Sequence, residues 1–163
     1  MLVALLSDIH DHTTHLLLAL QAAKDRGCTH LLFMGDMASA STFCLLREEW
    51  PHPMDLVFGN NEYELQTFER MASQWPHTTL HGALADITLG ERRLFFCHLP
   101  RDAGRAVRSG KYDAVFFGHT HQAEACTSGH TLIANPGEVY GRREAPGFAV
   151  YNTETNTVQL ISL

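Results

Sequence analysis

Short apolar runs that each end in a carboxylate, imidazole or carboxamide side chain constrain this chain more than any other feature. Five runs end in this way, at Asp8 and His10, at Asp36, at Asn60, at His98, and at His119 and His121. Such runs are typical of strands buried on both faces. Because ligands of open α/β sheets gather beyond the carboxyl ends of the strands, we expect these side chains to lie together.

The first half of the chain predicts a parallel sheet. Apolar runs over 2–6, 30–34 and 54–58 are each followed by a helical pattern, over 16–26, 42–49 and 62–74. The first of these helices has Gly27 directly after it, a residue that suits the end of a helix. Three strand-then-helix units imply parallel strands that are joined by right-handed crossovers.

The second half predicts shorter strands and one helix. A hairpin is expected over 85–89 and 92–97, a helix over 101–109 and a strand over 113–117. Further short strands are expected over 122–126, 131–134, 148–152 and 157–163. We therefore predict one mixed α/β domain over residues 1–163 with an antiparallel C-terminal part, since single cores commonly reach about 100–200 residues.

Charge and composition exclude several classes of protein. The net charge of −6 disfavours nonspecific binding to nucleic acid or to an anionic membrane surface. The apolar run at the N-terminus is only six residues long, too short for a signal peptide or a membrane span. The 4 cysteines form no C-x-x-C pair, which favours free thiols and a cytoplasmic location.

The donor types at the strand ends indicate a metal centre, although any one of them alone is more often a cap or turn residue. Oxygen and imidazole donors without thiolates suit Mn²⁺, Fe²⁺, Zn²⁺, Ni²⁺ or Co²⁺. Seven candidate ligands exceed the needs of one tetrahedral ion, whereas two ions that share a carboxylate would use them all. A two-metal centre acidifies a water and clamps the attacking and leaving oxygens of an in-line displacement, so phosphoester hydrolysis is the expected chemistry.

The order of the motifs resembles a known family. The motifs are Asp8-Ile9-His10, Gly35-Asp36, Gly59-Asn60-Asn61-Glu62, His98 and Gly118-His119-Thr120-His121, and they resemble the calcineurin-like metallophosphoesterase superfamily. The small size, with Gly110-Lys111-Tyr112-Asp113 and Asn135-Pro136-Gly137, resembles its compact bacterial and archaeal phosphodiesterase branch, to which the retromer subunit Vps29 is related. The resemblance implies a four-layer αββα sandwich, in which two facing mixed β-sheets are flanked by helices.

The resemblance also implies a role for each ligand. Asp8, His10, Asp36 and His121 would hold one divalent ion, and Asp36, Asn60, His98 and His119 would hold the second, with Asp36 bridging. A metal-bridging hydroxide would attack phosphorus while Asn60 helps to neutralise the phosphoryl oxygens. The implied cofactor is a pair of divalent ions, Mn²⁺ first, with Ni²⁺, Zn²⁺, Fe²⁺ or Co²⁺ as alternatives. The implied partner is a small-molecule phosphoester, and because relatives often self-associate, a homo-oligomer stays open.

Position 61 departs from the family pattern. Many members have a histidine there that contacts the phosphate and protonates the leaving oxygen, whereas this chain has Asn61. A carboxamide donates a hydrogen bond but no proton, so general-acid assistance worth about 10²–10⁴-fold would be missing. This favours substrates with good leaving groups over alkyl phosphomonoesters. His12 is a substitute proton donor; its alternative interpretation is a surface histidine paired with His15.

Two further side chains are expected near the site. Arg101 is a candidate contact for the substrate phosphate, against the alternative of a solvated helix face. Glu138 follows the Asn135-Pro136-Gly137 stretch, and a carboxylate at the rim of the site would disfavour highly anionic substrates.

The leading functional hypothesis is a dinuclear metal-dependent phosphodiesterase that acts on a small or nucleotide-like substrate. One alternative is a non-catalytic scaffold like Vps29, and another is a phosphomonoesterase that uses His12 as proton donor. The full set of metal donors favours an enzyme, while Asn61 keeps the scaffold hypothesis open.

Overall fold

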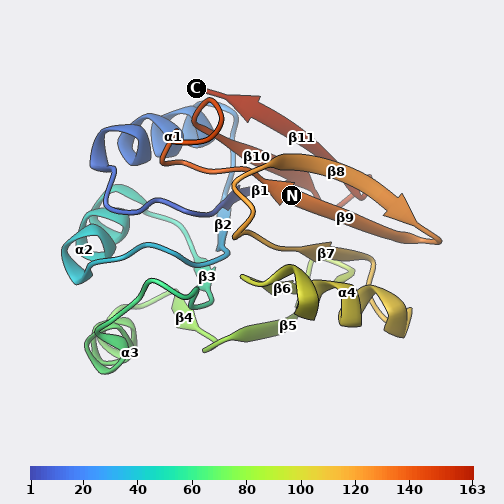
Figure 1. Ribbon diagram of the computed structural model, residues 1–163, viewed down its shortest axis with the longest axis horizontal. Coiled ribbons are helices and arrows are strands. Elements are labelled where there is room, and N and C mark those ends of the chain that lie inside the picture. The colour runs from blue at the N-terminus through green and yellow to red at the C-terminus, as the bar shows by residue number, and fades with distance from the viewer.

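Two facing β-sheets organise the computed structural model, which describes residues 1–163 (Figure 1). The strands are β1 (Leu2–Leu6), β2 (His30–Phe33), β3 (Met54–Leu56), β4 (Thr78–Leu80), β5 (Leu84–Leu89), β6 (Arg92–Cys97), β7 (Ala114–Phe116), β8 (Ala123–Ser128), β9 (Thr131–Pro136), β10 (Gly147–Asn152) and β11 (Thr157–Ser162). The helices are α1 (Thr13–Asp25), α2 (Ala40–Glu49), α3 (Leu65–Gln74) and α4 (Pro100–Ser109).

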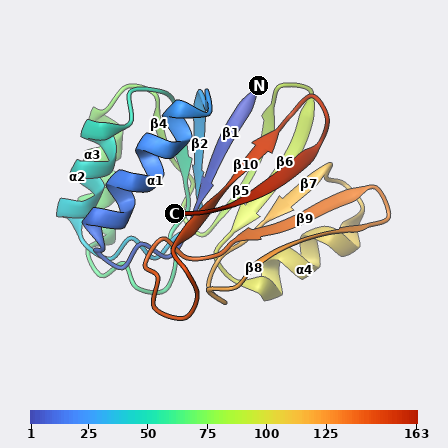
Figure 2. The ribbon, with the colours of Figure 1, turned by 90° about the horizontal axis from the view of Figure 1, so that it is seen from above.

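The helices cover the two outer faces of the sheets (Figure 2). Helices α1, α2 and α3 pack on one sheet around a core that includes Phe43 and Trp50, whereas α4 packs on the other sheet. A second core fills the space between the sheets, where Phe96 from β6 meets Tyr151 from β10. The predicted four-layer αββα sandwich is therefore confirmed.

Strand β1 shows why an unbroken apolar run is needed at the centre of this fold. Ala4 and Leu6 point into the core under the helices, whereas Val3 and Leu5 point into the core between the sheets. All four side chains are fully buried. A strand covered on both faces has no solvent-facing positions, so polar residues begin only where it ends.

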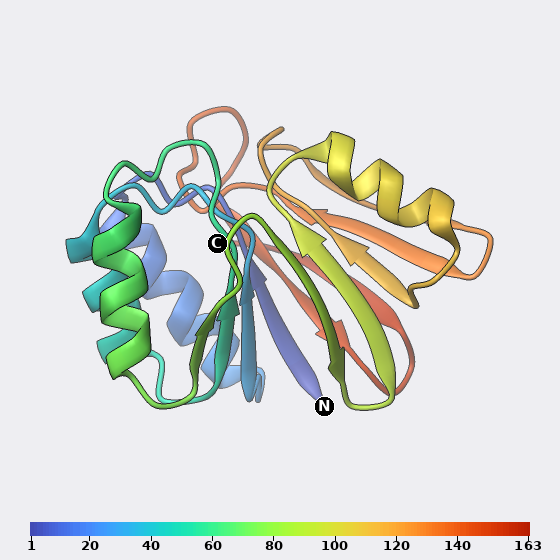
Figure 3. The ribbon, with the colours of Figure 1, turned by 90° about the horizontal axis from the view of Figure 1, so that it is seen from below.

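The first sheet has the strand order β11-β10-β1-β2-β3-β4. Strands β1, β2 and β3 run parallel, as the strand-then-helix units predict, and β4 adds a further parallel strand. The second sheet has the order β5-β6-β7-β9-β8 and contains the predicted β5–β6 hairpin. Strand β10 pairs antiparallel with β1 and so brings the end of the chain beside its beginning. The carboxyl ends of β1 and β6 face the same edge of the molecule (Figure 3).

Several elements differ from the sequence-based prediction, and three of the differences lie between β3 and β5. Strand β4 was not expected, helix α3 begins at Leu65 instead of residue 62, and β3 ends at Leu56 instead of residue 58. The last two differences lengthen the loop that carries Asn60 and Asn61. Glu62 braces this loop because its carboxylate accepts hydrogen bonds from the backbone N–H groups of Met37 (2.6 Å) and Gly59 (2.7 Å). None of the helices has the length and apolarity to cross a membrane.

Candidate metal centre

All seven predicted ligands lie on loops that leave the carboxyl ends of strands at one edge of the sandwich. These loops are tied together through their backbones. In the first sheet, the N–H of Asp8 donates to the carbonyl oxygen of Gly35 (3.0 Å) and so links two loops. In the second sheet, the N–H of Gly118 donates to the carbonyl oxygen of His98 (3.1 Å) and links two more. The N–H of His119 then donates to Asp8 Oδ2 at 3.0 Å, which joins the two sheets. Residues far apart in sequence thus meet at one place.

Most of these ligands have an unusual backbone conformation. Asp8, His10, Asp36, His119 and His121 all have positive φ angles, of 54°, 45°, 61°, 70° and 64°. Non-glycine residues seldom adopt this left-handed region, and such strain concentrates at functional sites. The sharp turns aim side chains from several loops at one point.

Two glycines allow the carboxylates to approach the backbone closely. A Cβ atom on Gly59 would collide with Asp36 Oδ1, and one on Gly118 would collide with the Ser7 hydroxyl and lie 2.8 Å from Asp8 Oδ2. The glycines at these two positions are therefore required by space.

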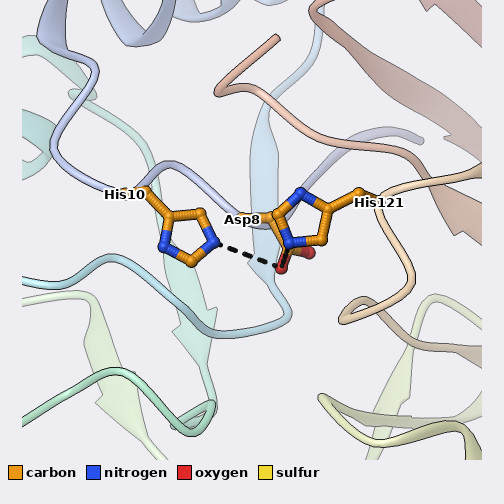
Figure 4. A group of neighbouring side chains, drawn as sticks. All are labelled: Asp8, His10 and His121. Carbon is orange, nitrogen blue, oxygen red and sulfur yellow. Dashed lines mark ion pairs between the residues drawn. The ribbon is translucent and has the colours of Figure 1, made fainter. Parts of the chain in front are cut away.

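One oxygen of Asp8 is held by hydrogen bonds, and the other faces the imidazoles of His10 and His121 (Figure 4). Its Oδ2 accepts hydrogen bonds from the Ser7 hydroxyl (2.5 Å) and from the N–H of His119 (3.0 Å). Its Oδ1 is buried without a hydrogen-bond partner and lies 3.3 Å from His121 Nε2 and 3.7 Å from His10 Nε2. His10 Nε2 is also buried without a partner. Unpaired buried polar atoms are rare, and here two of them face each other.

Asp36 shows the same division of its oxygens. Its Oδ1 accepts hydrogen bonds from the N–H groups of Asn60 (2.7 Å) and Asn61 (2.9 Å). Its Oδ2 lies 3.6 Å from His10 Nε2 and 3.4 Å from His98 Nε2, and it accepts a hydrogen bond from Asn61 Nδ2 at 2.6 Å. A single oxygen of Asp36 therefore faces both groups of imidazoles.

The atoms around His98 converge with the wrong polarity for hydrogen bonding among themselves. His98 Nδ1 lies 2.7 Å from the carbonyl oxygen of Met34, which can only accept, so this nitrogen carries the proton. The Nε2 lone pair then faces Asn60 Oδ1, another acceptor, at 3.0 Å, and it lies 3.2 Å from His119 Nδ1. Two acceptor atoms at this separation repel each other unless a cation lies between them. The donor set therefore fits a divalent metal ion.

The electrostatics of the cluster point the same way. Burial opposes ionisation of Asp36, but the nearby imidazole of His98 and the hydrogen bonds from Asn61 hold the pKa of its carboxyl well below the ordinary value. The nearby carboxylates of Asp8 and Asp36 raise the pKa of His10 against desolvation. Burial lowers the pKa of His98, yet Asp36 and Asp8 outweigh it and the net shift is upward. The site attracts positive charge.

Geometry groups the strongest donors in two overlapping sets. Donor atoms of Asp8, His10 and His121 lie within 4.8 Å of one another, and so do those of Asp8, Asp36 and His98. Asp8 is shared by the two sets, whereas the family resemblance implies that Asp36 is the bridging ligand. The Oδ2 contacts of Asp36 with both His10 and His98 keep that assignment compatible with the geometry.

A polar cleft of about 490 Å³ opens over these residues. No hydrophobic residue lines it, and its lining comprises Asp36, Asn60, Asn61, His119, Thr120, His121, Gln122 and Arg143. Arg143 is the only lysine or arginine among them, and it was not among the residues predicted from the sequence. It lies on the loop between β9 and β10, a few residues after the Asn135-Pro136-Gly137 stretch.

His12 and Arg101 belong neither to the ligand cluster nor to the lining of the cleft. His12 Nδ1 accepts a hydrogen bond from the N–H of His15 (3.3 Å) at the start of α1, and the two rings stack with centroids 3.7 Å apart. The pairing with His15 was the alternative interpretation of His12. The side chain of Arg101 is 71% exposed, lies 3.7 Å from Asp102 Oδ1 and does not line the cleft, an arrangement that fits the alternative of a solvated helix face.

Glu138 corrects another expectation. Its side chain is fully buried instead of standing at the rim, and its Oε2 lies 2.5 Å from His121 Nδ1. It therefore supports a ligand and does not repel substrate from the surface. Asn135 braces the same region, because its Nδ2 donates to the carbonyl oxygen of Gly118 (3.1 Å) and to Thr120 Oγ1 (2.9 Å).

Comparisons with known proteins agree with this architecture. The family model for the calcineurin-like phosphoesterase superfamily domain matches residues 1–156. The chain is 23% identical over 168 residues to phosphodiesterase MJ0936 of Methanocaldococcus jannaschii, an alignment that covers 100% of this chain and 99% of the relative.

Solved structures share the fold. A structure of an archaeal phosphodiesterase matches with a TM-score of 0.93 at 23% identity and covers 100% of both chains. The phosphoesterase YfcE from E. coli matches with a TM-score of 0.73 at 19% identity, over 99% of this chain and 93% of its own. Vps29 from Chaetomium thermophilum matches with a TM-score of 0.67 at 16% identity, over 100% of this chain and 97% of its own.

Proposed function

The chain belongs to the calcineurin-like phosphoesterase superfamily, and on this premise we propose that it is a metal-dependent phosphodiesterase with two divalent ions in its polar cleft. The observation that carries the proposal is the convergence of unpaired acceptor atoms from loops of both sheets. Asp8 Oδ1 and His10 Nε2 have no partner, and His98 Nε2 faces Asn60 Oδ1 and His119 Nδ1. Cations are the simplest way to satisfy all of them.

Asp8, His10, Asp36 and His121 would hold one ion, and Asp36, Asn60, His98 and His119 would hold the other. The two Asp36 Oδ2 contacts, with His10 and with His98, support Asp36 as the shared ligand. Divalent ions, Mn²⁺ foremost, supply positive charge against the phosphoryl oxygens and lower the pKa of the attacking water. Because the protein oxygens are fixed by backbone N–H groups, the donors need little rearrangement on binding.

The chain's own side chains position the substrate and handle its charge. The cleft accepts a diester whose phosphoryl oxygens face Asn60, Asn61 and His119, all of which line it. Water adds to phosphorus, one P–O ester bond breaks, and the departing oxygen takes its proton from solvent. Asn61 can donate a hydrogen bond to the phosphoryl group once its amide leaves Asp36 Oδ2. Because Asn61 carries no titratable proton, diesters with acidic leaving groups should react fastest.

Hydrolysis of two chromogenic esters tests the proposal. The protein is stripped with a chelator and assayed with bis(p-nitrophenyl) phosphate and p-nitrophenyl phosphate after addition of Mn²⁺, Ni²⁺, Zn²⁺ or Mg²⁺. We expect turnover that depends on metal and favours the diester. If neither ester shows metal-dependent turnover, the proposal of an enzyme is overturned and the alternative of a scaffold like Vps29 is left. If the monoester is preferred, the proposal of a diester substrate is overturned.

A further inference from the structure

The buried carboxylate of Glu138 uses its two oxygens for two different tasks. Oε2 lies 2.5 Å from His121 Nδ1, and an ionised carboxylate can only accept, so Nδ1 carries the proton. The lone pair of His121 Nε2 is thereby directed at Asp8 Oδ1, 3.3 Å away. Carboxylate partners of this kind fix the tautomer and orientation of a metal-binding imidazole and increase its basicity.

The other oxygen of Glu138 organises the loop between β9 and β10. Oε1 accepts hydrogen bonds from the N–H of Glu144 at 2.9 Å and, at closer range, from the N–H of Arg143. One charged group therefore holds both a candidate metal ligand and this loop.

The loop carries the only lysine or arginine that lines the cleft. Arg143 is solvent-exposed at the rim, and its Nη1 lies 3.4 Å from the carbonyl oxygen of Thr120, next to His119 and His121. The remaining lining is carboxylate, amide, hydroxyl and imidazole. A planar guanidinium at this place is suited to pair with two oxygens of a phosphoryl group.

Resting on the proposed function, we propose that Arg143 binds the phosphoryl group of the diester substrate and that Glu138 positions Arg143 and His121 together. Arg143 then supplies part of the binding that a histidine at position 61 would have given. Arg143 is a substrate-binding residue in this arrangement, and Glu138 is a positioning residue that acts through its two neighbours. Metal binding at His121 and the placement of Arg143 become coupled through one carboxylate.

The Glu138→Gln variant tests the positioning role because glutamine offers one acceptor oxygen where glutamate offers two. It cannot accept from His121 and from the loop N–H groups at the same time. Calorimetric titration of the chelator-stripped variant with Mn²⁺ should show affinity weakened by about 10–100-fold. The matched control is Glu144→Gln, because Glu144 lies on the same loop and its carboxylate bonds only the N–H of Ala123 at 3.1 Å. Wild-type affinity in Glu138→Gln, or equal weakening in both variants, would overturn the positioning role.

Hydrogen exchange on the unmodified protein gives a second readout that does not depend on the variant folding. If Glu138 couples the ligand to the loop, Mn²⁺ binding should slow exchange at the amides of Arg143 and Glu144. Unchanged exchange at both amides on addition of Mn²⁺ would overturn the coupling.

The Arg143→Ala variant tests the substrate contact. Its affinity for Mn²⁺ should equal that of the wild type, while inorganic phosphate should bind the Mn²⁺-loaded variant about tenfold or more weakly, and the KM for the diester should rise with a smaller change in kcat. Arg143→Lys should restore part of the loss because it keeps the charge. Unchanged phosphate binding in Arg143→Ala would overturn the contact. Phosphate binding is measured without turnover, so a wild-type protein that binds phosphate and hydrolyses nothing would refute the proposed function separately.

Discussion

The molecule contains two clusters of histidine and carboxylate side chains, the candidate metal centre and a second cluster around Asp55. They share residue types and differ in whether their polar atoms have hydrogen-bond partners. In the second cluster, which we call the Asp55 cluster, Asp55 lies between two histidines. Its Oδ2 is 2.7 Å from His30 Nε2 and its Oδ1 is 2.6 Å from His81 Nε2. The candidate metal centre instead leaves Asp8 Oδ1 and His10 Nε2 without partners.

The backbones differ as well. None of the three residues of the Asp55 cluster has a positive φ angle, whereas five of the seven candidate ligands do. The Asp55 cluster is also outside the polar cleft, and the His81 ring packs against Phe96 of the core between the sheets. Residue type alone therefore does not identify a metal site. Unpaired acceptors held by a strained backbone beside an open cleft distinguish the functional cluster from the structural one.

The sharpest contrast is expected in catalysis. Asp36→Asn should reduce diester hydrolysis by at least about 10³-fold, because it removes the shared charge of the metal centre. Asp55→Asn should leave kcat and the metal content near those of the wild type. Steady-state kinetics and metal analysis of both variants measure the difference, with about two equivalents of metal expected in the wild type. Full activity in Asp36→Asn would show that the ligand assignment is wrong.

Metal should stabilise the protein through the first cluster alone. At a hundredfold excess over the dissociation constant, Mn²⁺ should add about 2.7 kcal/mol per site to the free energy of unfolding. In a chain of this size that corresponds to a rise of about 5–10 °C in Tm. The rise should persist in Asp55→Asn and shrink in Asp8→Asn, as followed by thermal unfolding with metal or chelator. Equal shifts in both variants would erase the distinction between the clusters.

The Asp55 cluster should contribute to the pH dependence of the free energy of unfolding in acid. Burial opposes ionisation of Asp55, but hydrogen bonds from His30 and His81 lower its pKa from 3.8 to about 2. Since the folded-state pKa is depressed, the stabilisation is present above pH 3.8 and is lost as the pH falls through about 2. After allowance for solvent screening it amounts to about 1–2 kcal/mol.

Asp55→Asn should therefore lower the free energy of unfolding at neutral pH and flatten its decline between about pH 4 and pH 2. Urea unfolding of chelator-treated protein at a series of pH values measures this. A variant with the acid profile of the wild type would show that Asp55 gains nothing from its two histidines.

The smallest effect is expected at His12. Its ring nitrogen Nδ1 has a hydrogen-bond partner within the protein, as the ring nitrogens facing Asp55 in the Asp55 cluster do. Because its Nδ1 caps α1 and its ring stacks on His15, His12→Ala should cost about 1 kcal/mol of stability. Rates of hydrolysis across a series of aryl diesters should keep their dependence on leaving-group pKa. A steeper dependence in His12→Ala would restore His12 as the proton donor.

Local pattern was sufficient to predict the parallel sheet of the first half and the seven residues at the strand ends, whereas the layered arrangement of two sheets was implied by the family resemblance. An apolar run followed at once by a polar donor marks both a buried strand and its carboxyl end, so strand assignment and candidate ligands came from the same signal. Strand β4 escaped because Thr78 and Thr79 leave no apolar run, and the pairing of β10 with β1 joins segments that no local pattern connects.

Side chains that depend on tertiary placement could not be found in this way. Arg101 follows His98 closely in sequence, but helix α4 turns its side chain into solvent. Arg143 is distant from His121 in sequence, yet the loop around Glu138 brings it to the cleft. The role of Glu138 depends on partners 17 and 5 residues away along the chain, His121 and Arg143. The sequence draws attention to Glu138, directly after Asn135-Pro136-Gly137, but it does not show that the side chain is buried against His121.

The left-handed backbone at five candidate ligands has a consequence for the life of the protein in a cell. At about 1 kcal/mol each, the strain is on the order of 5 kcal/mol, comparable with the lower end of the net stability of an average domain. Under the proposed function, bound ions offset this strain in the folded state only. Chains synthesised when metal is scarce would unfold more often and be degraded sooner, so metal supply would govern the abundance of the protein as well as its activity.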